Sequence, residues 1–280
     1  IQKLTNDLLL DMSLGLNQEN GGVDSASYKN LPPADQPMLV VPGKLPSSLP
    51  PDSKTIVIDA GGTNFRSCLV SVSSSGQVSI SDLEKTKMPA IDKELSKVEF
   101  YDAIAKNLDH LKNKADRIGF CFSYPMEIQE DGDGILLGFS KEVKAPEVIG
   151  SAIGKCLKEE LENNGWNTIK RISLCNDTVA ALLAGAACAT EGDRFSSYIG
   201  FILGTGMNAA YLQPESSEYN IKKQIVVCES GKFLGVKRSD FDIEFDKTTV
   251  KPGTFYLEKL CSGAYLGPVS WFALTAAAKD

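Results

Sequence analysis

The sequence predicts an α/β fold that is built as two lobes with a cleft between them. Stretches rich in β-branched residues alternate with stretches of helical periodicity, a pattern typical of mixed sheets packed against helices. A strand, a glycine turn and a second strand occur twice, over residues 58–64 and 202–208. Both copies end on asparagine, so we interpret them as an internal duplication that places one glycine turn in each lobe.

The elements of the first half follow from apolar periodicity and turn-forming residues. An amphipathic helix is expected over residues 1–17, with an apolar side made of Leu4, Leu8, Leu9, Met12 and Leu16. Residues 18–53 are rich in Gly, Pro, Asn and Ser and predict a long irregular connection. The remaining elements are strands at 54–60, 65–73, 77–83, 118–123 and 169–175, and helices at 94–111 and 146–163.

A helix at 178–190 opens the second half and leads into the second copy of the repeat. Strands are expected at 197–203, 208–212 and 225–227, and a helix that begins at Pro252-Gly253 carries Glu258. The chain opens on Ile rather than Met and stops within an alanine-rich helix, so we expect both ends to be cut.

The composition is that of a globular protein with a substantial core, since 42% of the 280 residues are hydrophobic. A net charge of −7 and a pI near 5.0 argue against nucleic acid or an anionic membrane as a general partner. The seven cysteines are scattered without a CxxC motif, which predicts reduced thiols and a cytoplasmic location. No signal peptide is visible, and the single histidine excludes a His-based triad.

The most informative segment is the strand that ends in Asp59 and the glycine pair Gly61 and Gly62. The backbone N–H groups of such a turn can close around phosphate oxygens. The carboxylate of Asp59 can hold hydrated Mg²⁺, which usually binds one or two carboxylates together with substrate phosphates. An ordinary hairpin turn is the alternative interpretation of this short motif.

Other polar residues follow predicted strands but are ambiguous when each is taken alone. Asn176 and Asp177 stand between a buried strand and a helix, where they either cap the helix or present a base to an attacking hydroxyl. Ser123 is either a turn residue or a ligand hydroxyl, and lone glutamates such as Glu229 and Glu258 usually lie on the surface.

Taken together and in order, six segments resemble the hexokinase family of sugar kinases, in the actin-like ATPase superfamily. These segments are 59–66, 120–125, 176–177, 204–208, Glu229 and 258–267. The resemblance runs from about residue 27 to 267 and implies the actin-like ATPase fold, two lobes with ribonuclease H-like mixed sheets. It implies a small lobe at 54–178 and a large lobe made of 1–53 and 179–280.

The resemblance also implies a role for each matching residue. Asp177 corresponds to the catalytic base. The phosphates of ATP are assigned to Asp59, which also holds Mg²⁺ through water, and to Gly61, Gly62, Thr63, Asn64, Arg66, Gly204, Thr205 and Gly206. The hexose is assigned to Ser123, Ser140, Lys141, Asn176, Asn208, Glu229 and Glu258.

The implied activity is Mg·ATP-dependent phosphorylation of a hexose at its 6-hydroxyl, a reaction of glycolysis. Glucose is the expected substrate, although the pattern fits mannose and fructose too, and a homodimer is compatible with it. The chain departs from the family at Met207, Ser230 and Pro268, where Thr, Trp and an acidic residue are usual. The part of the family that binds adenosine has no counterpart in these 280 residues.

Three other functions compete with this interpretation. A catalytically silent sugar sensor on the same scaffold would bind hexose without turnover. A bacterial-type glucokinase would carry a cysteine-rich zinc segment, which the sequence lacks. An actin-like structural ATPase would leave Asp177, Glu229 and Glu258 without an obvious role.

Overall fold

The structure is a computed structural model that describes residues 2–19, 41–43, 52–139, 143–187, 195–215, 217 and 223–278. The chain divides into two compact units. Unit 2 is Pro46–Ala180, and unit 1 combines Ile1–Leu45 with Ala181–Asp280. No helix in the described ranges is long and apolar enough to cross a membrane.

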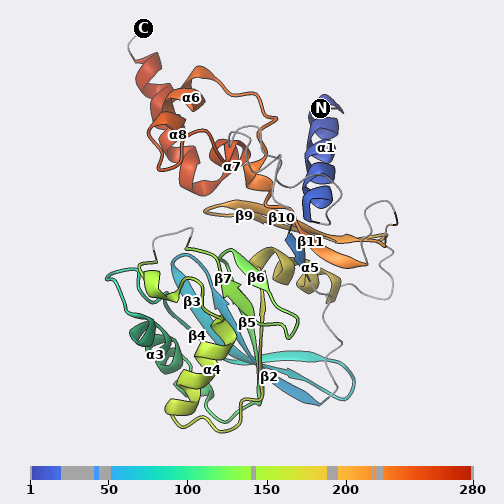
Figure 1. Cartoon of the computed structure of the whole chain (residues 1–280), viewed down its shortest axis with the longest axis vertical. Coiled ribbons are helices and arrows are strands. Elements are labelled where there is room, and N and C mark those ends of the chain that lie inside the picture. Colours follow the sequence, from blue (N-terminus) through green and yellow to red (C-terminus); the bar gives the residue numbers. More distant parts are fainter. Residues whose placement is uncertain are drawn as a thin grey trace. The chain divides into compact units, whose positions relative to one another are not determined.

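Unit 2 is organised around a five-stranded sheet with the strand order β4-β3-β2-β5-β8 (Figure 1). Its strands β2, β3 and β4 pair antiparallel, whereas β2, β5 and β8 run parallel, so the sheet is mixed. The strands are β2 (Ser53–Ala60), β3 (Asn64–Val72), β4 (Val78–Lys87), β5 (Arg117–Phe122) and β8 (Arg171–Cys175). These strands lie close to the predicted ranges, because short apolar runs bounded by Gly, Ser, Asn or Asp indicate both the strand type and its ends.

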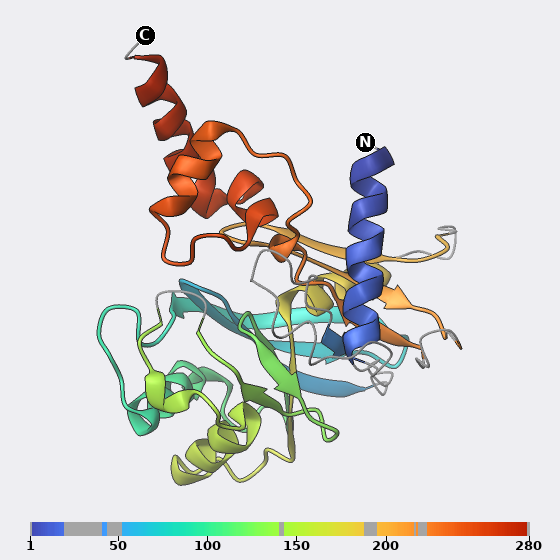
Figure 2. The ribbon, with the colours of Figure 1, turned by 45° about the horizontal axis from the view of Figure 1, so that its top comes forward.

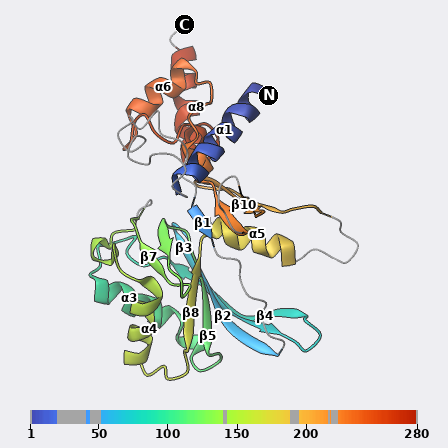
Figure 3. The ribbon, with the colours of Figure 1, turned by 45° about the vertical axis from the view of Figure 1, so that its right-hand side comes forward.

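One face of this sheet forms the core of unit 2. Ile58, Phe120 and Leu174 are opposite one another on β2, β5 and β8, and all three are buried. Helices α3 (Lys97–Asn107) and α4 (Ile153–Asn163) contribute buried residues to the same core, and they lie together on one side of the sheet (Figure 3).

The opposite face carries the polar residues of interest. Side chains alternate along a strand, so the residues that follow Ile58, Phe120 and Leu174 point away from the helices. They are Asp59, Cys121 and Cys175, which are opposite one another across the three parallel strands and only partly buried.

The predicted helix over 146–163 is wrong at its beginning. A 3-10 turn, η3 (Pro146–Val148), comes first, and Gly150 then takes a left-handed φ of 81°. Helix α4 begins only at Ile153, where the buried carboxylate of Asp133 accepts hydrogen bonds from Gly154 N at 2.6 Å and Lys155 N at 2.9 Å. The cap therefore comes from a residue that is distant in sequence, which local periodicity cannot reveal.

Two further differences concern short elements of unit 2. The helix predicted over 94–111 is divided into α3 and a 3-10 turn, η2 (Asp109–Leu111), and Ser96 and Glu99 form a capping box at its start. A two-stranded ribbon of β6 (Met126–Ile128) and β7 (Gly134–Leu136) was not predicted, since its strands are too short to show a period.

Unit 1 contains a second sheet, with the order β1-β11-β10-β9 and antiparallel pairing throughout. Its strands are β1 (Val41–Gly43), β9 (Ile199–Leu203), β10 (Met207–Gln213) and β11 (Gln224–Val227). Helices α6 (Asp240–Lys247), α7 (Tyr256–Cys261) and α8 (Gly263–Ala277) pack on one another (Figure 2). Helix α5 (Asp177–Ala187) begins in unit 2 and ends in unit 1.

Helix α1 (Gln2–Glu19) confirms the first predicted helix but not its apolar face. Leu16 is buried against Val226, with Tyr211 beside them, whereas Leu4 and Leu9 are 45% and 56% exposed. The helix therefore packs on the sheet at Leu16. Of the connection predicted over 18–53, the described part includes the end of α1 and strand β1, and most of the rest lies outside the described residues.

Candidate active site

The first glycine turn joins β2 to β3, and Ala60 and Phe65 form its last strand pair. Gly61 N donates to Asn64 O at 3.0 Å and so closes the turn. Within the ranges that the structure describes, the N–H groups of Gly62 and Thr63 make no hydrogen bond. The turn therefore presents two backbone donors.

The end of β5 is fixed to this turn. Ser123 N donates to Ala60 O at 3.1 Å, and the Tyr124 hydroxyl donates to Gly61 O at 3.1 Å. Burial raises the pKa of Tyr124, so its hydroxyl keeps its proton and remains a donor. Ser123 is thereby placed beside the glycine turn.

Asp59 and Arg66 form an ion pair across the β2–β3 hairpin. Arg66 Nη1 lies 2.7 Å from Asp59 Oδ2, and the two side chains are 43% and 42% exposed. Both side chains leave the strands beside the glycine turn, on the face that the helices do not cover. The guanidinium therefore orients the carboxylate and offsets its charge.

Asn176 and Asp177 follow β8, one strand beyond β5. Thr178 N donates to Asn176 Oδ1 at 2.9 Å and to Asp177 Oδ1 at 2.8 Å, so both side chains cap the start of α5. The second carboxylate oxygen of Asp177 makes no hydrogen bond in the described portion of the chain. Capping of α5 thus explains the position of Asn176 and uses one carboxylate oxygen of Asp177. The second oxygen of Asp177 remains able to accept a hydrogen bond.

The carboxyl ends of β2, β5 and β8 lie at one edge of the sheet, because these strands are parallel neighbours. Asp59, Ser123 and Asp177 follow from these three ends, and ligands of open α/β sheets bind at such an edge. The structure therefore gathers the predicted residues of unit 2 at one edge. Ser140 and Lys141 lie outside the described residues.

The second glycine turn joins β9 to β10 and confirms that the strand–turn–strand unit occurs twice. Gly204 N donates to Gly206 O at 2.9 Å, and Leu203 and Met207 form the last strand pair. Gly263 N donates to Gly204 O at 2.7 Å, so the start of α8 is hydrogen-bonded to the turn. The N–H groups of Thr205 and Gly206 make no hydrogen bond among the described residues.

Glu258 lies directly against this second turn. Its Oε2 accepts a hydrogen bond from Met207 N at 2.9 Å. A Cβ placed on Gly206 would lie 2.7 Å from the same oxygen, so glycine is needed for this approach. The predicted start of the Glu258 helix at Pro252 is wrong: α7 begins at Tyr256, after Phe255 takes a left-handed φ of 56°.

Asn208, on β10, is hydrogen-bonded to Glu229, which follows β11. Asn208 Nδ2 donates to Glu229 Oε1 at 3.0 Å, and Asn208 Oδ1 accepts from Ala209 N at 2.7 Å. Glu229 takes a left-handed backbone conformation with φ 49° and ψ 41°, at the end of β11. Burial lowers the pKa of nearby Lys232, an effect that the charge of Glu229 opposes. The structure therefore groups Asn208, Glu229 and Glu258 around the β9–β10 turn.

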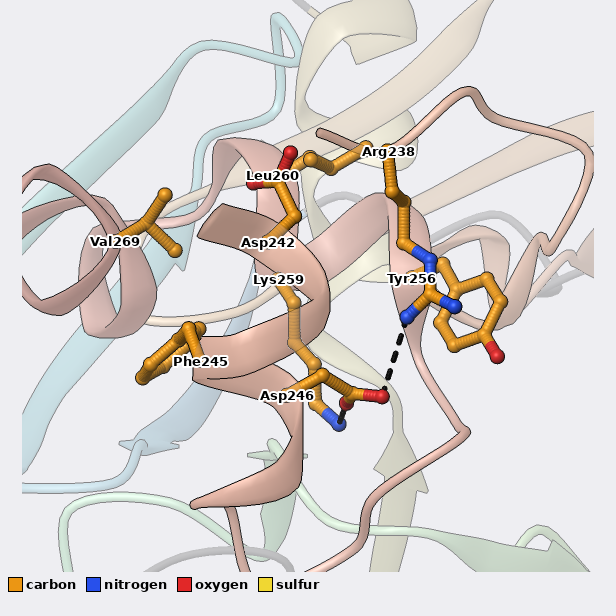
Figure 4. A pocket seen from close by; sticks show the side chains of 8 residues that line it. All are labelled: Arg238, Asp242, Phe245, Asp246, Tyr256, Lys259, Leu260 and Val269. Atoms are coloured by element: carbon orange, nitrogen blue, oxygen red, sulfur yellow. Dashed lines mark hydrogen bonds and ion pairs between the residues drawn. The ribbon is translucent and has the colours of Figure 1, made fainter. Parts of the chain in front are cut away.

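A buried ion network that the sequence did not reveal fixes α7. Lys259 Nζ is bonded to Asp246 Oδ1, and Arg238 Nη1 lies 3.1 Å from Asp246 Oδ2 (Figure 4). The Arg238 guanidinium also lies 3.5 Å from the centre of the Tyr256 ring. These residues line a small pocket between the helices. Glu258 directly precedes Lys259 on α7. The network therefore holds in place the helix that carries Glu258, a residue predicted to bind the sugar.

A second unpredicted feature is the pair Cys121 and Cys175, which face each other on β5 and β8. A hydrogen bond from the Cys121 thiol lowers the pKa of Cys175, against the opposing effects of burial and of Asp177. The same hydrogen bond, followed by burial, raises the pKa of Cys121. The register between two strands cannot be read from residue spacing, so this pair carries no signal in the sequence.

Comparisons with known proteins agree with this arrangement. Residues 1–187 match one hexokinase family profile and residues 198–280 match a second. Hexokinase-1 of Schizosaccharomyces pombe is 29% identical over 235 residues, which cover 76% of this chain and 47% of that protein. The hexokinase of Schistosoma mansoni is 31% identical over 228 residues, covering 76% of this chain and 49% of that protein.

The solved structure of hexokinase from Schistosoma mansoni complexed with glucose gives a TM-score of 0.70 at 23% identity. The match covers 96% of this chain and 66% of that chain, and it confirms the predicted fold class. The chain spans about half the length of the two curated relatives named above. Since the two family profiles together match residues 1–187 and 198–280, the chain belongs to the hexokinase family.

Proposed function

We propose that this protein transfers phosphate from Mg·ATP to the 6-hydroxyl of a hexose, with glucose as the expected substrate. Asp177 is the general base, and the two glycine turns bind the phosphates of ATP. In this proposal unit 2 corresponds to the small lobe, and unit 1 corresponds to the large lobe. The observation that carries the proposal is the grouping of Asn208, Glu229 and Glu258 at the second turn.

Phosphate binding is supported by the two turns. Gly62 and Thr63 in one turn, and Thr205 and Gly206 in the other, offer N–H groups that are not used within the described residues. Successive backbone N–H groups of this kind form anion-binding concavities. In this proposal Gly61, Asn64 and Gly204 shape the turns, because their own backbone groups close them.

Asp177 suits the role of a base for phosphoryl transfer. One of its oxygens is held by Thr178 N, which fixes the orientation of the carboxylate. The other oxygen is the proposed acceptor of the proton from the sugar hydroxyl. Phosphoryl transfer depends mainly on positioning and electrostatic stabilisation, so a fixed carboxylate matters more than a strongly shifted pKa.

The donor set of unit 2 fits a hydrated magnesium ion. Asp59 offers one partly exposed carboxylate beside the first turn, and magnesium commonly uses one or two carboxylates together with waters and phosphates. When bound with ATP, the ion supplies neutralisation of charge on the phosphates. Arg66 holds Asp59 in place and adds a positive charge beside the same turn.

Recognition of a hexose is supported by the chemistry of the unit 1 cluster. A sugar presents hydroxyls that both donate and accept, and glutamates accept strongly from them. Hydrogen bonds to charged groups contribute about 1.5–3 kcal/mol, against about 0.5–1.5 kcal/mol for neutral ones. In this proposal Glu229 and Glu258 bind sugar hydroxyls, together with Asn208, Asn176, Ser123, Ser140 and Lys141. The glucose in the related Schistosoma mansoni structure supports glucose as the first substrate to test.

The direct test is glucose-dependent formation of ADP from Mg·ATP by the full chain, beside a calorimetric titration with glucose alone. We expect both turnover and binding. Binding without turnover would instead support the sugar sensor, whereas filament formation without glucose binding would support the structural ATPase.

The pair Gly206→Ala and Gly204→Ala tests the sugar site within one turn. We expect Gly206→Ala to weaken glucose binding, because its Cβ would lie 2.7 Å from Glu258 Oε2 and would move that carboxylate. Gly204→Ala is the matched control, since no atom lies within 4 Å of its added Cβ. Losing a charged hydrogen bond costs about 1.5–3 kcal/mol, so the dissociation constant should rise roughly tenfold or more. Equal glucose affinities of the two variants would remove Glu258 from the sugar site.

A further inference from the structure

We propose that Cys121 and Cys175 form a dithiol that hydrogen peroxide oxidises to an intrachain disulfide, and that this modification displaces Asp177 at the start of α5. The effect on turnover rests on the function proposed above. The disulfide itself, and its effect on the start of α5, do not.

The two cysteines occupy the geometry that a disulfide needs. They are direct partners in the register of β5 and β8, so their side chains point to the same side of the sheet. Neighbouring strands lie about 4.7–4.9 Å apart, which is within the range of about 4.4–6.8 Å between the Cα atoms of disulfides. Both residues are free thiols and only partly buried, so a small oxidant can reach them.

No other cysteine in the described ranges has this arrangement. Cys68 lies opposite Val57 on the neighbouring strand, and Cys228 is buried at the end of β11. Cys156 is on α4, on the other side of the sheet from Cys121. The remaining described cysteine, Cys261, contacts the sulfur of Met207 at 3.3 Å.

The chemistry balances with peroxide as the oxidant. The Cys175 thiolate attacks one peroxide oxygen, an S–O bond forms, the O–O bond breaks, and the departing hydroxide takes a proton to become water. The sulfur of Cys121 then attacks the sulfenic acid of Cys175, which forms the S–S bond and breaks the S–O bond. The second hydroxide leaves as water with the thiol proton of Cys121. Two thiols are oxidised by two electrons, and one peroxide is reduced to two waters.

Closure of the disulfide has a structural consequence for the residues after β8. The Cα atoms of a disulfide are most often about 5.5–6 Å apart, which is farther than the roughly 4.8 Å between strands. Bond formation therefore pushes the end of β8 away from β5. Asn176 and Asp177 follow directly and hold Thr178 N, so they move with the strand. A misplacement of about 1 Å in catalytic groups costs roughly 10²-fold in rate.

The experiment compares the reduced 280-residue chain with the same chain after peroxide treatment, with and without subsequent dithiothreitol. Peptide mass spectrometry is expected to find a link between the peptides that contain Cys121 and Cys175. Hydrogen exchange of the Thr178 amide is expected to rise in the oxidised form. Glucose-dependent turnover is expected to fall by roughly 10²-fold and to return on reduction, since strained disulfides are labile.

Two variants sharpen the test. In Cys121→Ser, peroxide should oxidise Cys175 but form no intrachain disulfide. The reversible rise in hydrogen exchange of the Thr178 amide should therefore be absent. Cys156→Ser is the matched control and should behave as the parent chain, because it removes a partly exposed thiol from another element.

Two results would overturn the proposal. One is peroxide treatment that oxidises other thiols while Cys121 and Cys175 remain unlinked. The other is a linked chain in which Thr178 exchanges at its reduced rate. If the reduced chain shows no turnover at all, the proposed function fails, while the link and the exchange rate still decide the redox proposal.

Discussion

Asp177→Asn is expected to lower glucose-dependent turnover by roughly 10²–10⁴-fold, the range that general-base catalysis supplies. The asparagine keeps an oxygen for Thr178 N, so the start of α5 is retained. It loses the second carboxylate oxygen, the proposed acceptor of the hydroxyl proton. Steady-state turnover, measured beside glucose binding by calorimetry, should show a loss in kcat with little change in glucose affinity.

Asp177→Ala separates catalysis from capping. Alanine removes both oxygens, but Asn176 still accepts from Thr178 N, so the loss in stability should stay near the lower end of the about 0.5–2 kcal/mol that a lost cap costs. Asp109→Asn, an exposed carboxylate in η2, controls for the loss of one negative charge in unit 2. Turnover of Asp177→Asn near that of the parent would show that Asp177 serves only to cap α5.

The sequence predicted those parts of the fold that depend on local signals. Apolar runs that end in glycine located β2 and β9, and the glycine turns that follow them located the starts of β3 and β10, because strand type and turn position are both encoded within a few residues. The resemblance assigned Ser123, Asn208 and Glu229 to one sugar site, and in the structure Ser123 lies beside the first turn and Asn208 is bonded to Glu229.

Features that depend on residues far apart in sequence could not be predicted. Asp133 caps α4 from a ribbon of two short strands, so the start of that helix was placed too early. The partnership of Cys121 with Cys175 depends on the register between two parallel strands. In both cases the partner is chosen by tertiary packing, for which one sequence holds no local signal.

Lys259→Met is expected to destabilise the protein by about 3–5 kcal/mol, the usual cost of breaking a buried ion pair by removing one partner. Lys259 is buried, and its ammonium group bonds Asp246, Thr249 Oγ1 and Lys251 O. Lys247→Met on α6 is the matched control. Its ion pair with Glu244 is about 60% exposed on both sides, and exposed pairs contribute about 0–1 kcal/mol. Equilibrium urea unfolding of both variants measures the difference.

The same network predicts how stability depends on pH. Burial alone would raise the pKa of Asp246, but hydrogen bonds from Lys259, Gly253 N and Arg238 outweigh it, and the pKa is lowered. A carboxyl whose pKa is lower in the folded state stabilises the fold above its unfolded pKa of about 3.9 and loses that contribution as the pH falls. The parent should therefore lose stability on acidification below about pH 4, and Asp246→Asn should lose less over the same range.

A double variant tests whether Asp246 and Lys259 stabilise the protein as a pair. Replacing both partners, as Asp246→Leu with Lys259→Met, removes the most buried pair of charges together and leaves Arg238 on the Tyr256 ring; replacing a buried ion pair in this way is often neutral or stabilising. We expect the double variant to regain much of the stability that Lys259→Met loses. If Lys259→Met also weakens glucose binding, the double variant should recover it, because α7 would again hold Glu258 at the second turn. Additive losses in the double variant would mean that the two residues do not act as a pair, and that another contact positions α7.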